Sequence, residues 1–560
     1  MSNKKSIRTD DQSRIRLTFL LGALLGLLMF CLIYGVKVLV PTYDAWLFNG
    51  RNKEDLMQHY MGWLFYRKSS WSFPIGMIDD YCYPQGVPVI YSDSVPLFAL
   101  IFKVLSGILP STFQYFGIWG ALCMMMSGGF AAVCVYHFTK DTAYSVICSV
   151  FFSCSLVLIH KMFWHTALSA HWIVLASLYI WIEKEKKWSI YKSILYWSLL
   201  SVLSISIQAY FVPMVWGIML CSLLDRLVSA KELKKDIIRI VSVVCVSAAM
   251  SLLAGYVWGY FSGSMPNVGE IYGLFCFNFN SFFNTYDHSA FFKSLPVHYI
   301  CQYEAYCYLG IGMIVILAAD FTAALIRSHK SGKQIVPGKR HAVFALFIIG
   351  FVFFASSPEF SIGSYYIPYP IPSPVMKVLS VFRTNGRFIW PVYYMLLILL
   401  LAKFYELFKG KKPVYAATGL LLLLQLYESS IYIVPIGKYY HKTYTYECAL
   451  SSADWDKLSG YEHIIFYPDI AILYDDMKVR GKSLEVQYFA YEHDMTLNTV
   501  YLARDNSAQI NSEVYAMFES GAYKDQEKTI FVFLTEIPED ADLYFYTIDD
   551  ITIGTPEPID

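Results

Sequence analysis

Long apolar stretches alternate with short polar connections over most of the chain, from residue 17 to about residue 435. A stretch of about 20 apolar residues is long enough to cross a bilayer as a helix. The pattern therefore predicts about eleven transmembrane helices. They fall at residues 17–40, 114–138, 142–160, 168–183, 189–210, 211–229, 237–261, 306–326, 342–357, 388–408 and 413–435.

The apolar segment 96–109 is short for a crossing, and Lys103 interrupts it. We therefore expect a half-buried helix that belongs to the first outer loop, residues 41–113. With this register, the connections rich in lysine and arginine fall on one side of the membrane, and the long aromatic connections fall on the other. Because positively charged connections face the cytoplasm, the sequence predicts a cytoplasmic N-terminus and an outer first loop.

The pattern changes near residue 440, where short alternating segments such as 463–468, 529–535 and 543–548 replace the long apolar runs. Such segments are typical of strands, and polar helical stretches separate them. An odd number of spans places this part outside. The predicted fold is a mainly α, polytopic transmembrane helical bundle over residues 1–435, followed by a small extracytoplasmic α/β domain over residues 436–560.

The composition agrees with a membrane protein. Of the 560 residues, 56% are hydrophobic and only 16% are charged. So much apolar surface cannot be buried in one soluble core, and the lipid bilayer is the expected environment. The formal net charge is zero, which argues against nucleic acid as a partner.

The first outer loop carries most of the candidate chemistry. In residues 54–67, EDLMQHYMGWLFYR, Asp55 and His59 are four positions apart and share one face of a helix. The other face carries leucine and methionine, which predicts an amphipathic helix at the membrane interface that presents a carboxylate. An ordinary surface helix with its acidic residues in water is the alternative.

Further charged positions lie on the outer side. Asp93 precedes a Ser-Val-Pro turn and an apolar helix, where an aspartate acts either as a helix cap or as a catalytic group. Arg383 and Arg387 come just before a span, where two guanidinium groups either bind a phosphate or anchor the span at the interface. The outer segment 161–171 offers hydrogen-bonding residues or metal ligands: Lys161, His165 and His171.

Several features of the first loop follow one another in a fixed order. An acidic pair, Glu54-Asp55, opens the amphipathic helix, a W-x-x-P-x-G pattern occupies 71–76, and an Asp-x-x-Pro-Leu turn at 93–97 enters a short helix. This order resembles the first outer loop of the GT-C class of membrane glycosyltransferases. The wider chain also resembles a family of bacterial multispanning membrane proteins of unknown function, through DLMQHYMGWLFYR, YSDSVPL, YLGIG and RTNGRFIWPVYY.

The GT-C resemblance implies a catalytic role for acidic residues of this loop, here Asp55 with Glu54 beside it, and Asp93 as a further candidate. It also implies that outer basic residues hold a polyprenyl-phosphate leaving group. The candidates for binding the donor and its sugar are His59, Trp63, Arg67, Trp71, Lys103, Arg383 and Arg387. The class leaves open a divalent cation, Mg²⁺ or Mn²⁺, as cofactor. The W-W-D motif of oligosaccharyltransferases is absent from the sequence, which argues against transfer to an Asn sequon.

These features predict a membrane glycosyltransferase that moves a sugar from a polyprenyl-phosphate donor to an extracytoplasmic acceptor, which is an envelope glycan, lipid or protein. The resemblance places it in the bacterial cytoplasmic (inner) membrane. Two alternatives stay open, namely a transporter or flippase of a lipid-linked glycan and a non-catalytic envelope-assembly protein. The predicted spans contain few charges, and this disfavours the transporter.

Overall fold

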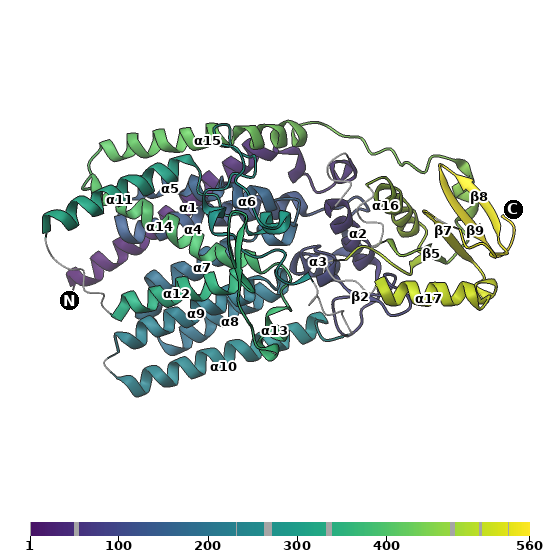
Figure 1. Ribbon diagram of the computed structural model, residues 1–560, viewed down its shortest axis with the longest axis horizontal. Coiled ribbons are helices and arrows are strands. Elements are labelled where there is room, and N and C mark those ends of the chain that lie inside the picture. Colours follow the sequence, from purple (N-terminus) through teal and green to yellow (C-terminus); the bar gives the residue numbers. More distant parts are fainter. Residues whose placement is uncertain are drawn as a thin grey trace.

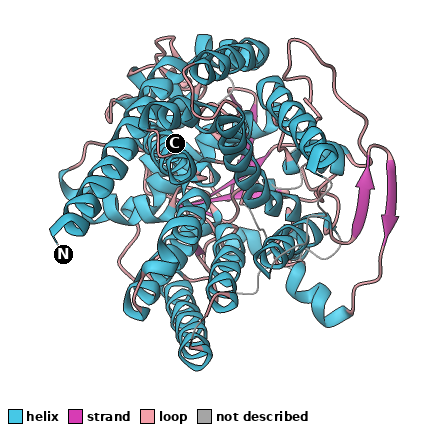
Figure 2. Ribbon diagram, turned by 90° about the vertical axis from the view of Figure 1, so that its left-hand side faces the viewer, coloured by secondary structure: helices cyan, strands magenta, loops and turns pink. Residues whose placement is uncertain are grey.

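The computed structural model is an elongated molecule, with a helical bundle at one end and a small sheet domain at the other (Figure 1). Figure 2 looks onto the end of the bundle that carries the N-terminus. The structure describes residues 2–49, 55–230, 232–262, 271–331, 339–470, 477–502, 507–535 and 537–559.

Ten helical segments within these residues are long and apolar enough to cross a membrane. They are Asp11–Tyr34, Phe116–Thr139, Thr142–Lys161, Thr166–Lys187, Ile190–Ile207, Phe211–Val228, Leu233–Trp258, Ile311–His329, Asn385–Leu407 and Pro413–Tyr440. An eleventh apolar helix, Arg340–Ser356, is shorter. The expected polytopic bundle is confirmed, with ten candidate spans and this shorter helix in the places of the eleven expected spans.

The helices of the bundle pack closely where small residues face one another. A Cβ at Gly22 of α1 (Ser2–Tyr34) would lie 2.6 Å from the Gly128 carbonyl oxygen of α4 (Phe116–Thr139), so glycine allows these two helices to approach this closely.

A short hairpin of β3 (Glu359–Ile362) and β4 (Tyr365–Pro368) follows the helix α12 (Lys339–Ser356). The bundle helices are α1 (Ser2–Tyr34), α4 (Phe116–Thr139), α5 (Thr142–Ser153), α6 (Leu156–Lys161), α7 (Trp172–Tyr179), α8 (Ile190–Ile207), α9 (Phe211–Val228), α10 (Leu233–Trp258), α11 (Ile311–Ser331), α12 (Lys339–Ser356), α13 (Ser373–Leu379), α14 (Trp390–Leu407) and α15 (Pro413–Tyr440).

The first loop is folded onto one end of the bundle. It contains α2 (Asp55–Lys68), a small hairpin of β1 (Met77–Ile78) and β2 (Val87–Pro88), and α3 (Pro96–Val104). With nine residues, α3 is too short to cross a membrane, in agreement with the expectation for this segment.

The helix α2 is not the interfacial helix that its sequence predicted. Every residue from 56 to 66 is buried, and Leu56, Met57 and Leu64 are at most 1% exposed. The helix α3 and the C-terminal helix α16 (Met477–Glu492) both pack against it. Because protein covers the apolar face as well as the acidic one, α2 presents no apolar surface to lipid.

The C-terminal part is a five-stranded sheet with strand order β6-β5-β7-β9-β8. The pairs β5–β6 and β5–β7 are parallel, whereas β7–β9 and β8–β9 are antiparallel. This sheet and its two helices confirm the expected small α/β fold. The elements are β5 (His463–Tyr467), α16, β6 (Thr496–Leu497), α17 (Ser507–Glu519), β7 (Thr529–Phe533), β8 (Tyr544–Ile548) and β9 (Ile551–Thr555).

The C-terminal domain is docked on the first loop. At the β6 edge of its sheet, Leu497 N donates to Asp80 O and Tyr83 N donates to Leu497 O, both at 2.9 Å. Gln58 of α2 also donates to Tyr501 O. We call this end of the bundle the loop end, and the opposite end, which carries residues 184–192 and 226–239, the basic end (Figure 1).

Candidate functional site

A buried carboxylate with three basic partners lies at the loop end. Glu304, in the 3₁₀ helix Ile300–Ala305, is 3% exposed. Lys161 Nζ lies 2.5 Å from its Oε2, Arg387 Nε and Nη2 lie 3.0 and 2.9 Å from the same oxygen, and His165 Nε2 lies 3.2 Å from Oε1. We call these four residues the Glu304 cluster.

The Glu304 cluster fixes its cations in place. Burial alone would raise the pKa of Glu304, but the charges of Arg387 and Lys161 outweigh it and hold that pKa well below its usual value. Arg387 also lies over the ring of Tyr210, 4.8 Å from its centroid. Within the described part of the chain, Arg387 Nη1 has no hydrogen-bond partner, so this group remains for a ligand.

A second carboxylate, Asp93, lies in a left-handed turn beside the cluster. Its φ is +54°, a conformation that aspartate and asparagine tolerate better than most residues. Ser94 Oγ donates to His59 O at 2.6 Å and ties the turn to α2. Asp93 does not cap the following helix, since the N-cap residue of α3 is Val95. The capping alternative for Asp93 is therefore wrong.

Two side chains contact the Asp93 carboxylate. Gln208 Nε2 donates to its Oδ1 at 3.2 Å, and His59 Nε2 lies 3.5 Å from Oδ2. Burial raises the pKa of Asp93 to about 7; the charge of Arg387 lowers this pKa, and that of Asp55 raises it. Burial also lowers the pKa of His59 to about 3, so its imidazole is neutral near pH 7. A carboxyl group with such a pKa can accept and release a proton near neutral pH.

The structure brings four of the predicted site residues together, namely Asp55, His59, Asp93 and Arg387. Asp55 begins α2, and its charge acts on both Asp93 and Tyr303. Glu54 lies outside the described residues.

Two predicted residues of α2 hold the loop in place instead. Arg67 donates to the carbonyl oxygens of residues 109, 110 and 111 at 3.0–3.1 Å, and Trp63 Nε1 donates to Phe113 O at 3.1 Å. Both side chains therefore join α2 to the connection before α4, away from the Glu304 cluster.

The remaining predicted binding residues are also outside the cluster. Lys103 lies over the rings of Tyr66 and Trp71, and burial lowers its pKa to about 8. Arg383 lies over the ring of Phe275, 5.7 Å from its centroid. A role for these side chains in donor binding stays a prediction.

The sequence did not single out Glu304, the centre of the cluster, or Gln208, which donates to Asp93. It did single out Lys161 and His165, but not Glu304, the carboxylate that both of them contact. One signal was present, because Glu304 is the only acidic residue between positions 288 and 319, close to the start of a span. Glutamate is rarely buried without a partner, so its position among aromatic residues was the one indication of a buried ion pair.

Gly62 of α2 lies directly against the Asp93 turn. A Cβ there would lie 2.5 Å from side-chain atoms of Ser92 and Ser94. We expect Gly62→Ala to push this turn away from α2 and to lower the free energy of unfolding by about 1–3 kcal/mol. Thermal unfolding measures the change. Gly419→Ala is the control, since a Cβ at Gly419 meets no atom within 4 Å, and equal unfolding temperatures for the two variants would contradict the packing argument.

No group of three or more His, Cys, Asp or Glu side chains in the described residues is arranged to hold a metal ion. Mg²⁺ or Mn²⁺ as cofactor thus stays a prediction, and the chemistry below is derived from the side chains alone.

Three comparisons with known proteins bear on the identity of the chain. The crystal structure of an oligosaccharyltransferase from Archaeoglobus fulgidus, in the apo form, matches with a TM-score of 0.34 and 11% sequence identity, over 85% of this chain and 64% of the archaeal one. This chain thus spans 64% of that protein's length. No curated protein matches. Residues 23–430 match the family described as Domain of unknown function (DUF6311), and residues 454–556 match the DUF6311 C-terminal domain. The chain therefore belongs to the DUF6311 family.

Proposed function

We propose that this membrane protein is a glycosyltransferase that moves a sugar from a polyprenyl-phosphate donor to an extracytoplasmic acceptor, which is an envelope glycan, lipid or protein. The observation that supports this most is that Asp93, a carboxyl group with a pKa of about 7, lies within electrostatic reach of Arg387 and Lys161, the cations held by Glu304, at one end of a membrane bundle. One group can take a proton while the others stabilise a phosphate.

The proposed reaction uses Asp93 as the base and the neighbouring cations as the phosphate-binding groups. An acceptor hydroxyl attacks the anomeric carbon of the donor sugar, and its proton passes to Asp93. As the new bond between acceptor oxygen and anomeric carbon forms, the bond from that carbon to the phosphate oxygen breaks. The electron pair stays on the leaving polyprenyl phosphate, whose growing charge Arg387 and Lys161 stabilise. Arg387 Nη1, which no described residue uses, is the group that contacts the phosphate.

The other residues of the site position these groups. Glu304 holds the Arg387 and Lys161 side chains in fixed rotamers, so the cations do not reorganise during the reaction. Asp55 raises the pKa of Asp93, and Gln208 orients its carboxylate. We place the loop end outside the bacterial cytoplasmic membrane and the basic end in the cytoplasm, because lysine and arginine collect at the latter.

The test is a transfer assay with the purified full-length chain in proteoliposomes. A panel of radiolabelled polyprenyl-phosphate sugars is supplied together with an envelope extract that contains glycans, lipids and proteins. The expected result is that one donor loses its sugar to an acceptor and leaves polyprenyl phosphate. If every donor stays intact, the proposal is wrong, and a donor that crosses the bilayer unchanged favours a flippase instead.

Asp55→Asn is expected to move the pH profile of transfer toward acid. The charge of Asp55 raises the pKa of Asp93, so its removal lowers that pKa and leaves the base form present at lower pH. The acidic limb of the kcat/KM profile is therefore expected to shift down by about 0.5–1 pH unit. An unchanged limb, with activity retained, would show that Asp55 does not act through Asp93. Asp79→Asn is the control, a carboxylate of the same loop that is not among the main charges acting on the pKa of Asp93.

A further inference from the structure

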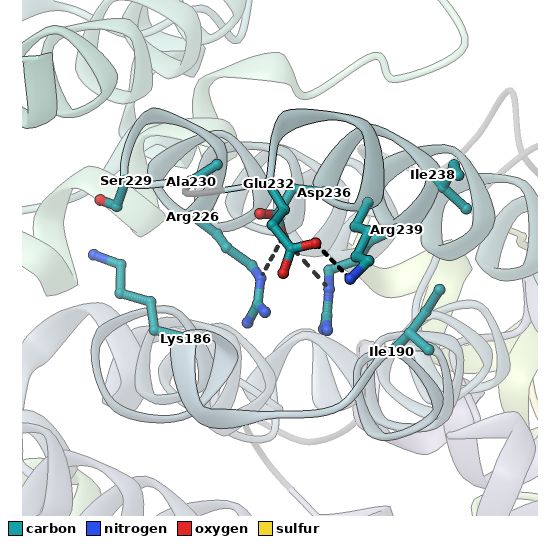
Figure 3. Close-up of a pocket in the computed structure, with 10 residues that line it drawn as sticks. Lys186, Ile190, Arg226, Ser229, Ala230, Glu232, Asp236, Ile238 and Arg239 are labelled. Carbon is teal, nitrogen blue, oxygen red and sulfur yellow. Dashed lines mark hydrogen bonds and ion pairs between the residues drawn. The ribbon is translucent and has the colours of Figure 1, made fainter.

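A cavity of about 670 Å³ lies at the basic end, between the first residues of α8, the last residues of α9 and the first residues of α10 (Figure 3). Four of its lining side chains are cationic, namely Lys186, Arg226, Lys235 and Arg239. Glu232 and Asp236 are the acidic residues of the lining. Two more carboxylates contact its cations from outside the lining, since Asp225 Oδ2 lies 2.5 Å from Lys186 Nζ and Glu185 Oε1 lies 3.5 Å from Arg239 Nη1. The helix α8 separates this cavity from the Asp93 site by about 27 Å, at 1.5 Å for each of its 18 residues.

The two arginines are held in place by Asp236 of the lining and by Glu185 and Ser193 behind it. Arg226 Nε lies 2.9 Å from Asp236 Oδ1, and its Nη1 donates to Glu185 O at 2.7 Å. Arg239 Nη1 donates to Ser193 Oγ at 2.9 Å and lies 3.5 Å from Glu185 Oε1. Asp236 and Glu185 thus fix both guanidinium groups before any ligand is present.

Each arginine keeps one donor group for a ligand. Among the described residues, no side chain or carbonyl accepts from Nη2 of Arg226 or Nη2 of Arg239. Figure 3 shows the two guanidinium groups side by side, both directed into the space between the helices. Two planar guanidinium groups at fixed positions match the oxygens of a phosphate better than they match a single carboxylate.

The surroundings of the cavity join this polar site to an apolar surface. Ile190 and Ile238 belong to its lining, and Ile238 is 52% exposed. The span formed by α10 is only 22% buried inside the protein, which leaves most of it free to contact lipid. A ligand with a phosphate head and an apolar tail would fit both parts. Basic pockets between transmembrane helices are known to bind the head groups of anionic lipids.

We propose that this cavity is a second ligand site, independent of the transferase site, and that it binds a phosphate group through Arg226 and Arg239, with Lys186 and Lys235 at its rim. The source of the phosphate is either the head group of an anionic phospholipid or a soluble phosphate compound. An occupied site ties together the ends of α8, α9 and α10, so its ligand stabilises the bundle against unfolding.

The test measures thermal unfolding of the purified full chain in detergent, with phosphatidylglycerol, phosphatidylcholine or inorganic phosphate added. Stabilisation by phosphatidylglycerol beyond that by phosphatidylcholine supports the site with a lipid source. Equal stabilisation by inorganic phosphate supports it with a soluble source. No stabilisation by either anion would overturn the proposal.

Single substitutions test whether the stabilising anion binds in this cavity. Arg226→Gln is expected to weaken the apparent affinity for the stabilising anion at least tenfold. Arg226→Gln also removes the Arg226–Asp236 ion pair. Lys186→Gln serves as a second variant, because it removes a different ion pair, Lys186–Asp225, and leaves the Arg226–Asp236 contact intact. An affinity loss of about threefold is expected there. Lys411→Gln, an exposed lysine outside the cavity lining, should leave the affinity unchanged. Equal losses in Lys186→Gln and Lys411→Gln would show general charge attraction and would overturn the proposal.

Discussion

Replacing Glu304 with glutamine is expected to lower the free energy of unfolding by about 3–5 kcal/mol, because it leaves two buried cations without their shared anion. Lys161 is 1% exposed and Arg387 is 7% exposed, so water does not take over the role of the carboxylate. Thermal or denaturant unfolding of the purified protein in detergent measures this loss.

A matched control distinguishes the loss of the buried Glu304 cluster from the loss of an ordinary, exposed ion pair. Glu462→Gln makes the same chemical change at a carboxylate whose side chain is 58% exposed and pairs with the exposed Lys528. Exposed pairs of this kind contribute about 0–1 kcal/mol. Equal losses of stability in the two variants would contradict the assignment of a buried, coupled cluster around Glu304.

The Glu304 cluster also gives stability a dependence on pH. The pKa of Glu304 in the folded protein lies well below 4.5, the ordinary value for a glutamate. Its stabilising contribution is therefore fully present above the pKa of the unfolded chain and is lost as the pH falls below 4.5 toward the folded-state pKa. Acid should thus narrow the difference in stability between the native chain and Glu304→Gln.

Asp93→Asn is expected to raise the free energy of unfolding at pH 8, whereas Glu304→Gln is expected to lower it. The pKa of Asp93 rises from 3.8 to about 7 on folding, so the folded protein binds this proton more tightly than the unfolded chain does. The cost of the charge grows as the pH rises from about 4 to about 7 and is constant above. The upper limit of this cost is about 4 kcal/mol. Asparagine removes the cost because it carries no charge, and its side-chain oxygen still accepts a hydrogen bond from Gln208.

The measurement is the unfolding temperature of Asp93→Asn and of the native chain at pH 5 and pH 8. The gain is expected to be larger at pH 8, and a gain that does not change with pH would contradict the raised pKa. Asp93→Ala is the control for the backbone, because alanine at a φ of +54° costs about 1–2 kcal/mol that asparagine largely avoids. A charge that costs stability in the resting protein is typical of a functional group.

The sequence predicted the bundle well because a span is a local property. Each of the ten candidate spans contains a window of 18 residues with high mean hydropathy and at most two charged residues, and such a window can be recognised from the sequence alone. The position of Asp55 and His59 on one face of a helix was also predictable, because it follows from the helical periodicity alone. The helix itself was misread as interfacial, since α16, which covers it, comes about 420 positions later in the chain.

The Glu304 cluster was not predictable from spacing. Lys161 lies 143 positions before Glu304, and Arg387 lies 83 positions after it. Only the packing of α6, the 3₁₀ helix Ile300–Ala305 and the 3₁₀ helix Asn385–Ile389 before α14 brings these charges together. The two alternatives for Asp93 could not be separated from the sequence for the same reason, because Gln208 and Arg387, which act on its carboxylate, are remote in the chain.

In the proposed mechanism, Asp93 is the proton acceptor in sugar transfer from a lipid phosphate. The most direct test is the initial rate of label transfer in proteoliposomes at pH 8, for the native chain, Asp93→Asn and Asp79→Asn at equal protein. If Asp93 is the proton acceptor, the rate should be about 10²–10⁴-fold lower for Asp93→Asn and unchanged for Asp79→Asn. A rate for Asp93→Asn within a factor of two of the native rate would contradict this role.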